Sequence, residues 1–391
     1  MIIPKEDQLL IDRIKSAIGS KKYFVKRRAS GLLKHDYLVP GGFYNEQWDW
    51  DGFYMGVALA SEIPTEAVFL KNWALNYMEL SDERGYSPGC VTPNGPEKGT
   101  RAFPMKPFIA QGVYLSSNFL NDFIWIKHYY KKLRKMVLYR EKNLWSKKLD
   151  LGVWGNWMES GADNNLSILG FPKSSVVATD VNTFIYREYK AMSKIASALN
   201  KKKDVSFFAK RAETIKKNMQ KYLWDDTDKT FYNYNLKTNE FIRKHTYSNM
   251  IPLWEKIASL KDGKEMIEKY VVNPNKLWSN HGIRTLTKDD PLYNNKKMIT
   301  PYSNWQGPVW PHTNYMHMHS LLNYGFEKEA FLLSRKITQL CLSDFEKSGG
   351  MHECYSAETG APLAADNFVS WNLLVGNMLP EAYSGNNPFS I

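Results

Sequence analysis

The stretch that decides the fold is residues 185–224, IYREYKAMSKIASALNKKKDVSFFAKRAETIKKNMQKYLW. Its apolar residues recur at alternating spacings of three and four, which places them on one face of each of two helices. They are Ile185, Tyr189, Met192, Ile195 and Leu199, then Val205, Phe208, Ala212, Ile215, Met219 and Tyr222. A short turn over Asn200 to Asp204 separates the two sets, and Asp204 suits the N-cap of the second helix. The stretch predicts an antiparallel αα-hairpin.

The same helical pattern continues along the chain. A second hairpin surrounds Gly325, which fits a helix C-terminal cap. Twelve candidate helices cover residues 6–18, 49–61, 64–80, 107–118, 122–146, 180–199, 204–223, 246–258, 261–271, 308–324, 327–345 and 366–379. Short turns join many of them and no Pro/Ser/Gly linker divides the chain, so we expect an all-α fold of six hairpins in a ring, with residues 1–391 as a single domain. Lys229 to Ile242 predicts one small β-hairpin insertion.

Composition and charge narrow the possible classes of protein. The chain has 391 residues, of which 43% are hydrophobic and 14% aromatic, so it can bury a large core. Lys and Arg number 52 against 40 Asp and Glu, a net charge of +12 that raises the question of nucleic-acid binding. The basic runs at 21–28, 131–135 and 201–203 lie at helix ends and turns, apart from the aromatic loops, so we expect solvated surfaces and no nucleic-acid partner.

Other partners and cofactors find no support in the sequence. The N-terminus lacks a signal-peptide pattern and no segment approaches 18 consecutive apolar residues, which predicts a cytoplasmic protein with no membrane role. There is no HExxH, CxxC, nucleotide-binding or serine-hydrolase motif, and only His312 and His319 share a helix face. We therefore expect neither a metal nor a cofactor. Nothing in the sequence indicates the oligomeric state.

Five long connections are rich in Trp, Tyr, Gly and carboxylates, which is where a helical scaffold carries a site. They span residues 40–50, 81–106, 152–175, 278–311 and 347–366. Sugar rings need flat aromatic surfaces for their apolar faces and polar side chains for their hydroxyls. Cleavage of a glycosidic bond further needs two carboxyl groups. The loops therefore suggest carbohydrate chemistry, and the alternative is that they only cap the ends of the ring.

Two places in these loops could supply the carboxyl groups. Glu159 and Asp163 lie close together beside Trp157, and both a like charge and an aromatic environment raise a carboxyl pKa, as a general acid requires. The alternative is that Ser160 or Asp163 caps a turn. Glu353 lies in the loop before the last helix, where it is either catalytic or an ordinary surface glutamate.

Four segments resemble the motifs of known glycosidases. Residues 40–51 (PGGFYNEQWDWD) are similar to the first trehalase signature and its counterpart in glycoside hydrolase family 63. Residues 157–164 (WMESGADN) resemble the segment that carries the general acid in both families. Residues 302–311 (YSNWQGPVWP) resemble a family 63 segment, and residues 351–355 (MHECY) the segment that carries the general base. The resemblance implies an (α/α)6 barrel, in agreement with the helix pattern.

The resemblance also implies a role for each matched residue. Asp163 would be the general acid and Glu353 the general base of hydrolysis with inversion, which needs carboxyl groups roughly 6.5–9.5 Å apart. Glu159 would orient the acid loop or raise the Asp163 pKa. The residues implied to contact a small α-linked glycoside are Trp48, Trp50, Asp51, Gln111, Asn182, Trp305, Gln306, Gly307, Trp310 and Trp371.

Departures from the trehalase pattern bear on the substrate. Phe43 stands where trehalases have arginine, and residues 304–311 (NWQGPVWP) replace the trehalase QWD segment, so the comparison favours family 63. That family includes α-glucosidases and hydrolases of mannosylglycerate or glucosylglycerate. A glycerate group needs a basic or hydroxyl-rich pocket. Its candidates, which have ordinary structural roles as the alternative, are Arg101, Arg187, Arg284 and Tyr86.

Two other functions remain open. One is hydrolysis of α,α-trehalose, and the other is sugar binding without catalysis on the same fold. The presence of both carboxyl residues, Asp163 and Glu353, argues against the second.

Overall fold

The computed structural model describes residues 3–96, 102–298 and 303–391. The described residues form twelve α-helices: Lys5–Lys21 (α1), Asp49–Glu62 (α2), Ala67–Leu80 (α3), Ile109–Phe119 (α4), Ile126–Asn143 (α5), Thr179–Ala198 (α6), Lys202–Tyr222 (α7), Tyr247–Met250 (α8), Leu260–Met266 (α9), Pro311–Asn323 (α10), Glu327–Ser348 (α11) and Val375–Ser384 (α12).

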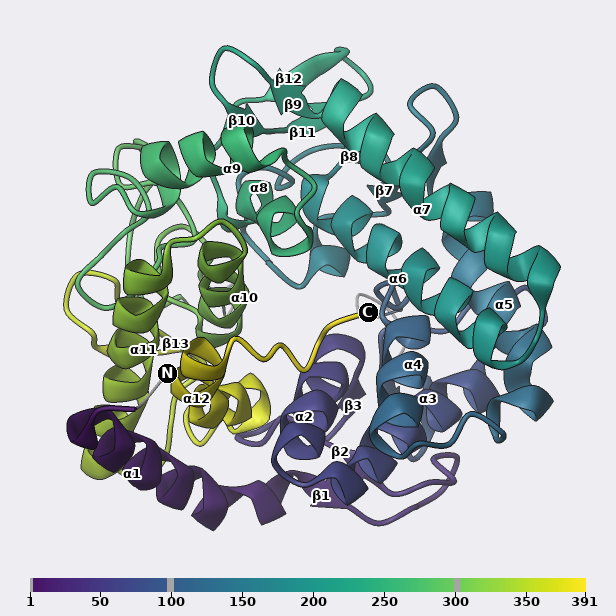
Figure 1. Ribbon diagram of the computed structural model, residues 1–391, viewed down its shortest axis with the longest axis horizontal. Coiled ribbons are helices and arrows are strands. Elements are labelled where there is room, and N and C mark those ends of the chain that lie inside the picture. The colour runs from purple at the N-terminus through teal and green to yellow at the C-terminus, as the bar shows by residue number, and fades with distance from the viewer. Residues whose placement is uncertain (1–2, 97–101, 299–302) are drawn as a thin grey trace.

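The helices alternate between an outer and an inner circle, as Figure 1 shows. Helices α2, α4, α6, α8, α10 and α12 surround the centre, and the odd-numbered helices pack outside them. The inner helices are buried nearly all round; in α2, every residue from Asp49 to Ala60 is buried. The outer α7 buries only one stripe, Phe208, Ala212, Ile215 and Met219, as its three-and-four spacing predicts. The expected all-α ring of six hairpins, an (α/α)6 barrel, is confirmed.

Several of the predicted helices differ from the structure at their ends, and two of them show the physical reason. The predicted helix 246–258 begins as α8 and continues as a 3₁₀ turn, Ile251–Glu255, in which Pro252 has no N–H for a helical hydrogen bond. The predicted helix 366–379 begins later, with a 3₁₀ turn at Ser370–Leu374 before α12. The N–H groups of Val369 and Ser370 instead donate to the carbonyl of Pro40. Tertiary contacts therefore replace the first turn of that helix.

Short strands join the hairpins: Lys26–Arg27 (β1), Tyr37–Leu38 (β2), Gln47–Trp48 (β3), Cys90–Thr92 (β4), Gly95–Pro96 (β5), Trp145–Ser146 (β6), Leu151–Trp154 (β7), Val176–Val177 (β8), Trp224–Asp225 (β9), Thr230–Phe231 (β10), Asn233–Asn235 (β11), Glu240–Ile242 (β12), Cys354–Tyr355 (β13) and Pro362–Leu363 (β14). The largest sheet is antiparallel, with the order β12-β11-β8-β7-β6.

The predicted β-hairpin is confirmed as β11 and β12, but it does not stand alone. Val177 of β8 pairs with Tyr234 of β11 on one side and with Val153 of β7 on the other. Strands of two to four residues are too short to show an alternating pattern, so the sequence did not reveal β6, β7 and β8. The sheet matters to the site because β7 leads directly into the loop that carries Asp163.

The centre of the ring is filled at one end by the last residues of the chain (Figure 1). Phe389 is fully buried and packs against Phe53, Tyr54 and Tyr315 of the inner helices. Arg187 of α6 donates a hydrogen bond to the Phe389 carbonyl at 2.5 Å. The inner helices are thus closed off here, and the first turns of α2 and α10 are left to shape a cavity. Within the described residues, no helix combines enough length and apolar character to cross a membrane.

Candidate active site

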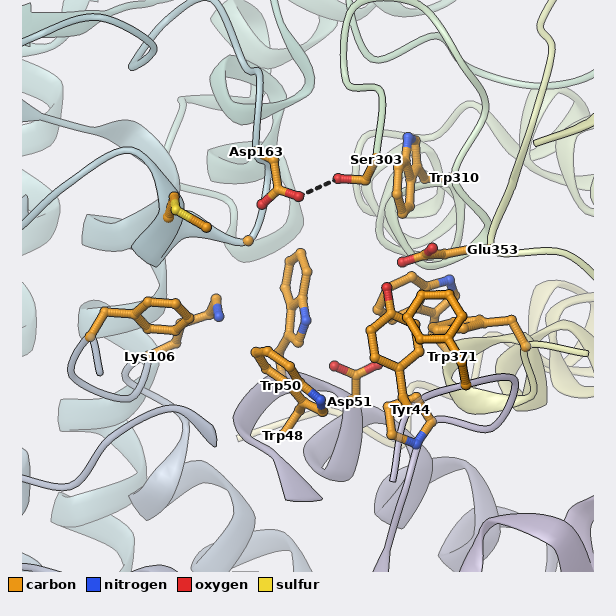
Figure 2. Close-up of a pocket in the computed structure, with 16 residues that line it drawn as sticks. Tyr44, Trp48, Trp50, Asp51, Lys106, Asp163, Ser303, Trp310, Glu353 and Trp371 are labelled. Atoms are coloured by element: carbon orange, nitrogen blue, oxygen red, sulfur yellow. Dashed lines mark hydrogen bonds between the residues drawn. The ribbon is translucent and has the colours of Figure 1, made fainter. Parts of the chain in front are cut away.

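A cavity of about 920 Å³ opens beside the first turns of α2 and α10 (Figure 2). All four segments that resemble glycosidase motifs contribute to its lining, although Tyr302, the first residue of the third segment, lies outside the described residues. The lining consists of Pro40, Phe43, Tyr44, Trp48, Trp50, Asp51, Phe103, Lys106, Met158, Gly161, Asp163, Ser303, Trp310, Glu353, Phe368 and Trp371. Aromatic side chains and three carboxyl groups therefore meet in one place.

Asp163 reaches the cavity from the loop after β7. A 3₁₀ turn, Met158–Ser160, ends at Gly161, which has a φ of 79°. A Cβ at Gly161 would lie 2.6 Å from the Trp50 ring, so glycine is needed for both its conformation and its size. The Asp163 Oδ2 accepts a hydrogen bond from the Ser303 hydroxyl at 2.6 Å. Burial raises the pKa of Asp163, and the Ser303 hydrogen bond and the charge of Lys106 offset part of that rise.

Glu353 lies directly before β13, and its side chain reaches the cavity. Its backbone N–H donates to the Ala365 carbonyl at 2.9 Å, and β13 pairs with β14 directly after it. The hydrogen bond and the strand pair together fix the backbone that carries Glu353. Burial, and next the nearby charge of Asp51, raise the pKa of Glu353 to about 8. Figure 2 shows Asp163 and Glu353 on different walls of the cavity.

Asp51 is the third carboxyl group and lies in the first turn of α2. Its Oδ1 accepts a hydrogen bond from Ser370 at 2.6 Å, and burial raises its pKa to about 7. Each of Asp51 and Asp163 adds to the pKa of Glu353 through its charge. Carboxyl groups that interact in this way lose their protons in succession. The cavity can thus hold protonated and ionised carboxyl groups side by side.

Indole rings that pack against one another form the aromatic side of the cavity. Trp50 and Trp371 meet edge to face with their ring centres 5.6 Å apart, and Trp310 lies 5.9 Å from Trp371. Trp305 stacks on Trp310 at 4.0 Å and is almost fully buried, so it supports the cavity from behind. His312 packs on Trp371 at 4.3 Å, and burial holds its pKa well below the ordinary value. This histidine is therefore neutral and structural.

Gln111 and Asn182, two predicted sugar contacts, lie outside the cavity lining. The Gln111 amide donates to the Pro107 carbonyl at 2.6 Å and accepts from Arg187. The Asn182 amide accepts from the Gly152 N–H at 2.7 Å and donates to the Gly152 carbonyl, and so joins α6 to β7. Both side chains are fully buried and are engaged by protein groups. Their observed role is to join elements behind the site.

Glu159 also lies outside the lining. It is fully buried and forms an ion pair with Arg140, and it accepts hydrogen bonds from Arg140 and from the Gly155 N–H. These bonds fit the prediction that Glu159 orients the acid loop. The alternative, that Glu159 raises the pKa of Asp163, has no support, because burial is what raises that pKa.

Gln306 and Gly307 lie beside the loop that carries Asp163 and not on the cavity surface. The Gln306 amide donates to the Asn164 carbonyl at 3.0 Å. Gly307 approaches the Asn294 backbone so closely that a Cβ would lie 2.2 Å from its carbonyl oxygen. These residues hold the 303–310 segment in place.

The proposed glycerate contacts are not brought together. Arg101 lies outside the described residues. Arg187 forms an ion pair with Glu255 near the ring centre, and Arg284 binds Glu358 in another part of the molecule. The Tyr86 hydroxyl donates to the Ala102 carbonyl at 2.8 Å. None of these three described side chains lines the cavity.

Lys106 is the cation that lines the cavity, and the sequence did not reveal it. Its ammonium group lies 3.0 Å from Asp49 Oδ1 and 4.7 Å from the centre of the Trp50 ring. Lysines are rarely buried, so no single-sequence signal distinguishes Lys106 from a surface residue. Other lining residues that were not singled out as contacts are Pro40, Phe43, Tyr44, Phe103, Met158, Gly161, Ser303 and Phe368. Among the described residues, no three His, Cys, Asp or Glu side chains cluster as a metal site would require.

The ring of six hairpins with carboxyl groups in an aromatic cavity defines a class of proteins, the six-hairpin glycoside hydrolases. The chain belongs to the family of the mannosylglycerate hydrolase MGH1-like glycoside hydrolase domain, whose family model matches residues 146–371. The resemblance to glycoside hydrolase family 63 is thereby confirmed.

Individual relatives are distant in sequence. A mannosylglycerate hydrolase of Rubrobacter radiotolerans is 24% identical over 190 residues, which cover 49% of this chain and 40% of that protein. A trehalase of Bombyx mori is 21% identical over 388 residues, covering 83% of this chain and 63% of the trehalase. The chain thus spans less than two thirds of either relative.

Solved structures share the fold. The GH63 mannosylglycerate hydrolase of Thermus thermophilus, in complex with glucose, superposes with a TM-score of 0.71 at 17% identity, covering 92% of this chain and 99% of that chain. Neutral trehalase Nth1 of Saccharomyces cerevisiae gives a TM-score of 0.68 at 15% identity, covering 91% of this chain and 76% of that chain.

Proposed function

We propose that the protein hydrolyses a small α-linked glycoside with inversion, with Asp163 as general acid and Glu353 as general base. The observation that carries the proposal is the meeting of two carboxyl groups, the buried Glu353 and the partly buried Asp163, in one cavity lined also by aromatic side chains. Both carboxyl groups have raised pKa values, and burial is the main cause in each case. We also propose that residues 1–391 act as a single domain, because all six hairpins share one core.

The proposed reaction assigns one proton transfer to each carboxyl group. Asp163 gives its proton to the glycosidic oxygen as the bond to the anomeric carbon breaks. Glu353 takes a proton from a water molecule that attacks that carbon from the opposite face. One limb of the pH profile then reports the ionisation of Asp163, and the other reports that of Glu353. Asp51 would accept hydrogen bonds from the hydroxyls of the cleaved sugar, and Trp50 would contact its apolar face.

The proposed substrates are α-glucosides and α-mannosides, such as disaccharides and glycosyl-glycerates. A named mannosylglycerate hydrolase and named trehalases are among the relatives, and this supports both kinds of substrate. Trehalose is the second candidate because the trehalase match extends over 83% of the chain. The cytoplasmic location stays a prediction of the sequence.

Two substitutions test the assignment of the carboxyl groups. Asp163→Asn and Glu353→Gln keep the size of each side chain and remove its acid or base function. We expect each to lower kcat by at least about 10²-fold, the range over which proton transfer contributes to catalysis. Glu327→Gln, at an exposed position on α11, is the matched control. Turnover near that of the parent protein in either cavity variant would contradict the role assignment.

The substrate and the stereochemistry are measured with the unmodified protein. Trehalose, kojibiose, nigerose and mannosylglycerate are incubated with it, and released monosaccharide is scored. NMR of the first product formed should then show the β anomer from an α-linked substrate. An initial α product would mean retention and would contradict Glu353 as a base acting on water.

A further inference from the structure

A short segment, residues 303–306, is hydrogen-bonded to the loop that carries the acid. The Trp305 N–H donates to the Asn164 side-chain oxygen at 2.6 Å, and the Asn164 amide donates to Asn304 at 3.3 Å. The Gln306 amide donates to the Asn164 carbonyl at 3.0 Å. Asn164 directly follows Asp163, so the two segments form one rigid unit around the acid.

Ser303 is the member of this unit that touches Asp163. Its hydroxyl donates to Asp163 Oδ2 at 2.6 Å, and it accepts a hydrogen bond from the Trp305 indole N–H at 3.3 Å. Both Ser303 and Trp305 are buried, and a hydrogen bond is stronger in such surroundings than in bulk water. The indole donor orients the serine oxygen so that its own proton points at Asp163. Figure 2 shows the second carboxyl oxygen of Asp163 pointing away from Ser303.

We propose that Ser303 is a positioning residue that occupies Oδ2 of Asp163 and so leaves Oδ1 as the oxygen that holds the transferable proton. The inference rests on the proposed function, because it assumes that Asp163 is the general acid. In the reaction, the Oδ1–H bond breaks as the glycosidic oxygen takes the proton, together with the electron pair of its broken bond to carbon. Ser303 keeps its own proton and stabilises the carboxylate that remains on Asp163.

A pH profile of Ser303→Ala tests this role. The Ser303 hydrogen bond favours the ionised form of Asp163. Its loss should therefore raise the pKa of Asp163 by about one unit. The limb of the kcat/KM profile that reports Asp163 should therefore move about one unit to higher pH, because Asp163 keeps its proton to a higher pH. We expect kcat to fall about tenfold on the best O-glycoside of the panel, since the proton is no longer held on one oxygen. KM should change by less than about twofold, because Ser303 has no assigned contact with the sugar.

The leaving group separates positioning from a merely structural role. Fluoride needs far less help from a general acid than a sugar alkoxide does. The α-glycosyl fluoride of the same sugar should therefore be hydrolysed by Ser303→Ala at nearly the parental rate. Ser303→Thr keeps the hydroxyl and should restore the parental pH profile. Ser320→Ala removes a buried serine hydroxyl that donates to the Met316 carbonyl outside the cavity lining, and it is the matched control.

The possible outcomes distinguish the two proposals. If neither limb of the pH profile moves in Ser303→Ala, or if activity falls equally with the O-glycoside and the fluoride, the role of Ser303 is overturned. If Asp163→Asn is inactive in that case, the proposed function still stands. If Asp163→Asn hydrolyses the O-glycoside at the parental rate, the proposed function fails first and the inference fails with it.

Discussion

Lys106 and Asp49 form an ion pair that is almost completely buried under the cavity. The side-chain exposures are 1% and 0%, and Asp49 also accepts a hydrogen bond from the Lys106 backbone N–H at 2.7 Å. A buried charge that loses its partner is far less stable than a buried pair. This pair also holds the Trp50 ring, which lies against the ammonium group. The pair therefore supports the aromatic lining of the cavity both by its charge and by its packing.

We expect Lys106→Met to lower the free energy of unfolding by about 3–5 kcal/mol, because it leaves Asp49 buried and unpaired. The double variant Lys106→Met/Asp49→Asn should recover a large part of this loss, since no uncompensated charge remains. Urea unfolding of the parent protein, both single variants and the double variant measures the coupling between the two sites. Simple additivity of the two single losses would contradict a direct pairing.

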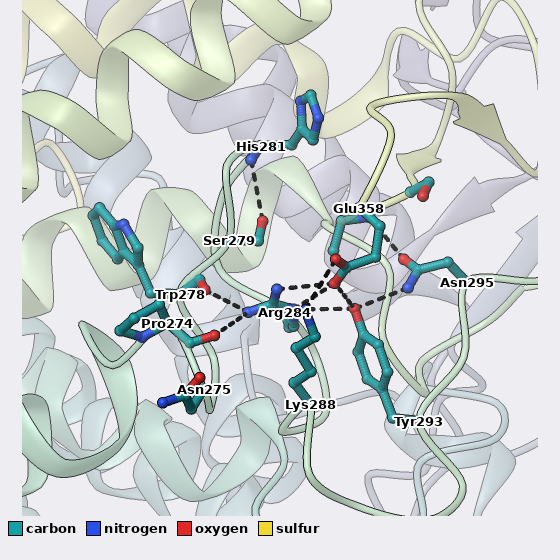
Figure 3. Close-up of polar contacts among 12 residues, drawn as sticks. Pro274, Asn275, Trp278, Ser279, His281, Arg284, Lys288, Tyr293, Asn295 and Glu358 are labelled. Carbon is teal, nitrogen blue, oxygen red and sulfur yellow. Dashed lines mark hydrogen bonds and ion pairs between the residues drawn. The ribbon is translucent and has the colours of Figure 1, made fainter.

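At the scale of elements, a polar cluster joins the loop 278–298 to the loop that follows the proposed base (Figure 3). Arg284 is buried and donates to Glu358 at 2.9 Å and to the Trp278 carbonyl. Tyr293 donates to Glu358 at 2.6 Å, and Asn295 accepts from the Ala357 N–H at 2.7 Å. Although burial alone would raise the pKa of Glu358, the hydrogen bonds from Tyr293 and Arg284 hold that pKa at about 2. The two loops are thus joined while Glu358 is ionised.

Substitutions at two cations that contact Glu358 should have unequal effects on stability. Arg284→Met removes the donor to the Trp278 carbonyl and the buried cation that pairs with Glu358, and we expect a loss of about 2–4 kcal/mol. Lys288 is half exposed and lies 3.3 Å from the other Glu358 oxygen, so Lys288→Met should change stability by no more than about 0.5 kcal/mol. Thermal melts of both variants test the contrast. Equal losses of stability in the two variants would show that the contact between the two loops depends on charge alone.

At the scale of the whole molecule, buried ionisable groups make stability depend on pH. Burial raises the pKa of Asp51 to about 7 and of Glu188 and Glu353 to about 8. These groups hold protons in the folded state at pH values where the unfolded chain releases them, so they destabilise the fold as pH rises. Burial lowers the pKa of His245 to about 4 and of His317 to about 3. These two histidines therefore make the fold more stable as pH rises toward their ordinary pKa of about 6.5. Of the groups named here, only the carboxyl groups still change the stability above that pH.

We therefore expect the melting temperature to fall as pH rises from about 6.5 to about 8, with each unit of raised pKa worth about 1.4 kcal/mol. Glu353→Gln should flatten this slope, because glutamine stays neutral throughout. Glu327→Gln on the outer surface is the control and should keep the slope. Melting curves at several pH values in this window check the prediction, and a slope that is unchanged in Glu353→Gln would contradict a raised pKa at that residue.

The sequence predicts the helices well where one stripe of a helix is buried. In α7 the stripe from Phe208 to Met219 appears at the expected spacing, because burial on one face leaves a periodic pattern in the chain. The start of α12 was predicted too early, because the backbone of Val369 and Ser370 binds Pro40, more than 300 residues away. A contact so remote in the chain leaves no local signal.

The sequence by itself determined the ring of hairpins, the four loop segments of the site and the family, because these depend on residue type and local spacing. Only the tertiary structure decided which side chains reach the cavity. Gln111, Asn182, Trp305 and Gln306 turned out to support it from behind, while Lys106 and Ser303 line it. The reason is physical: a polar or aromatic residue in a loop can satisfy protein groups or a substrate equally well. The direction of its side chain depends on neighbours that the fold brings from distant parts of the chain.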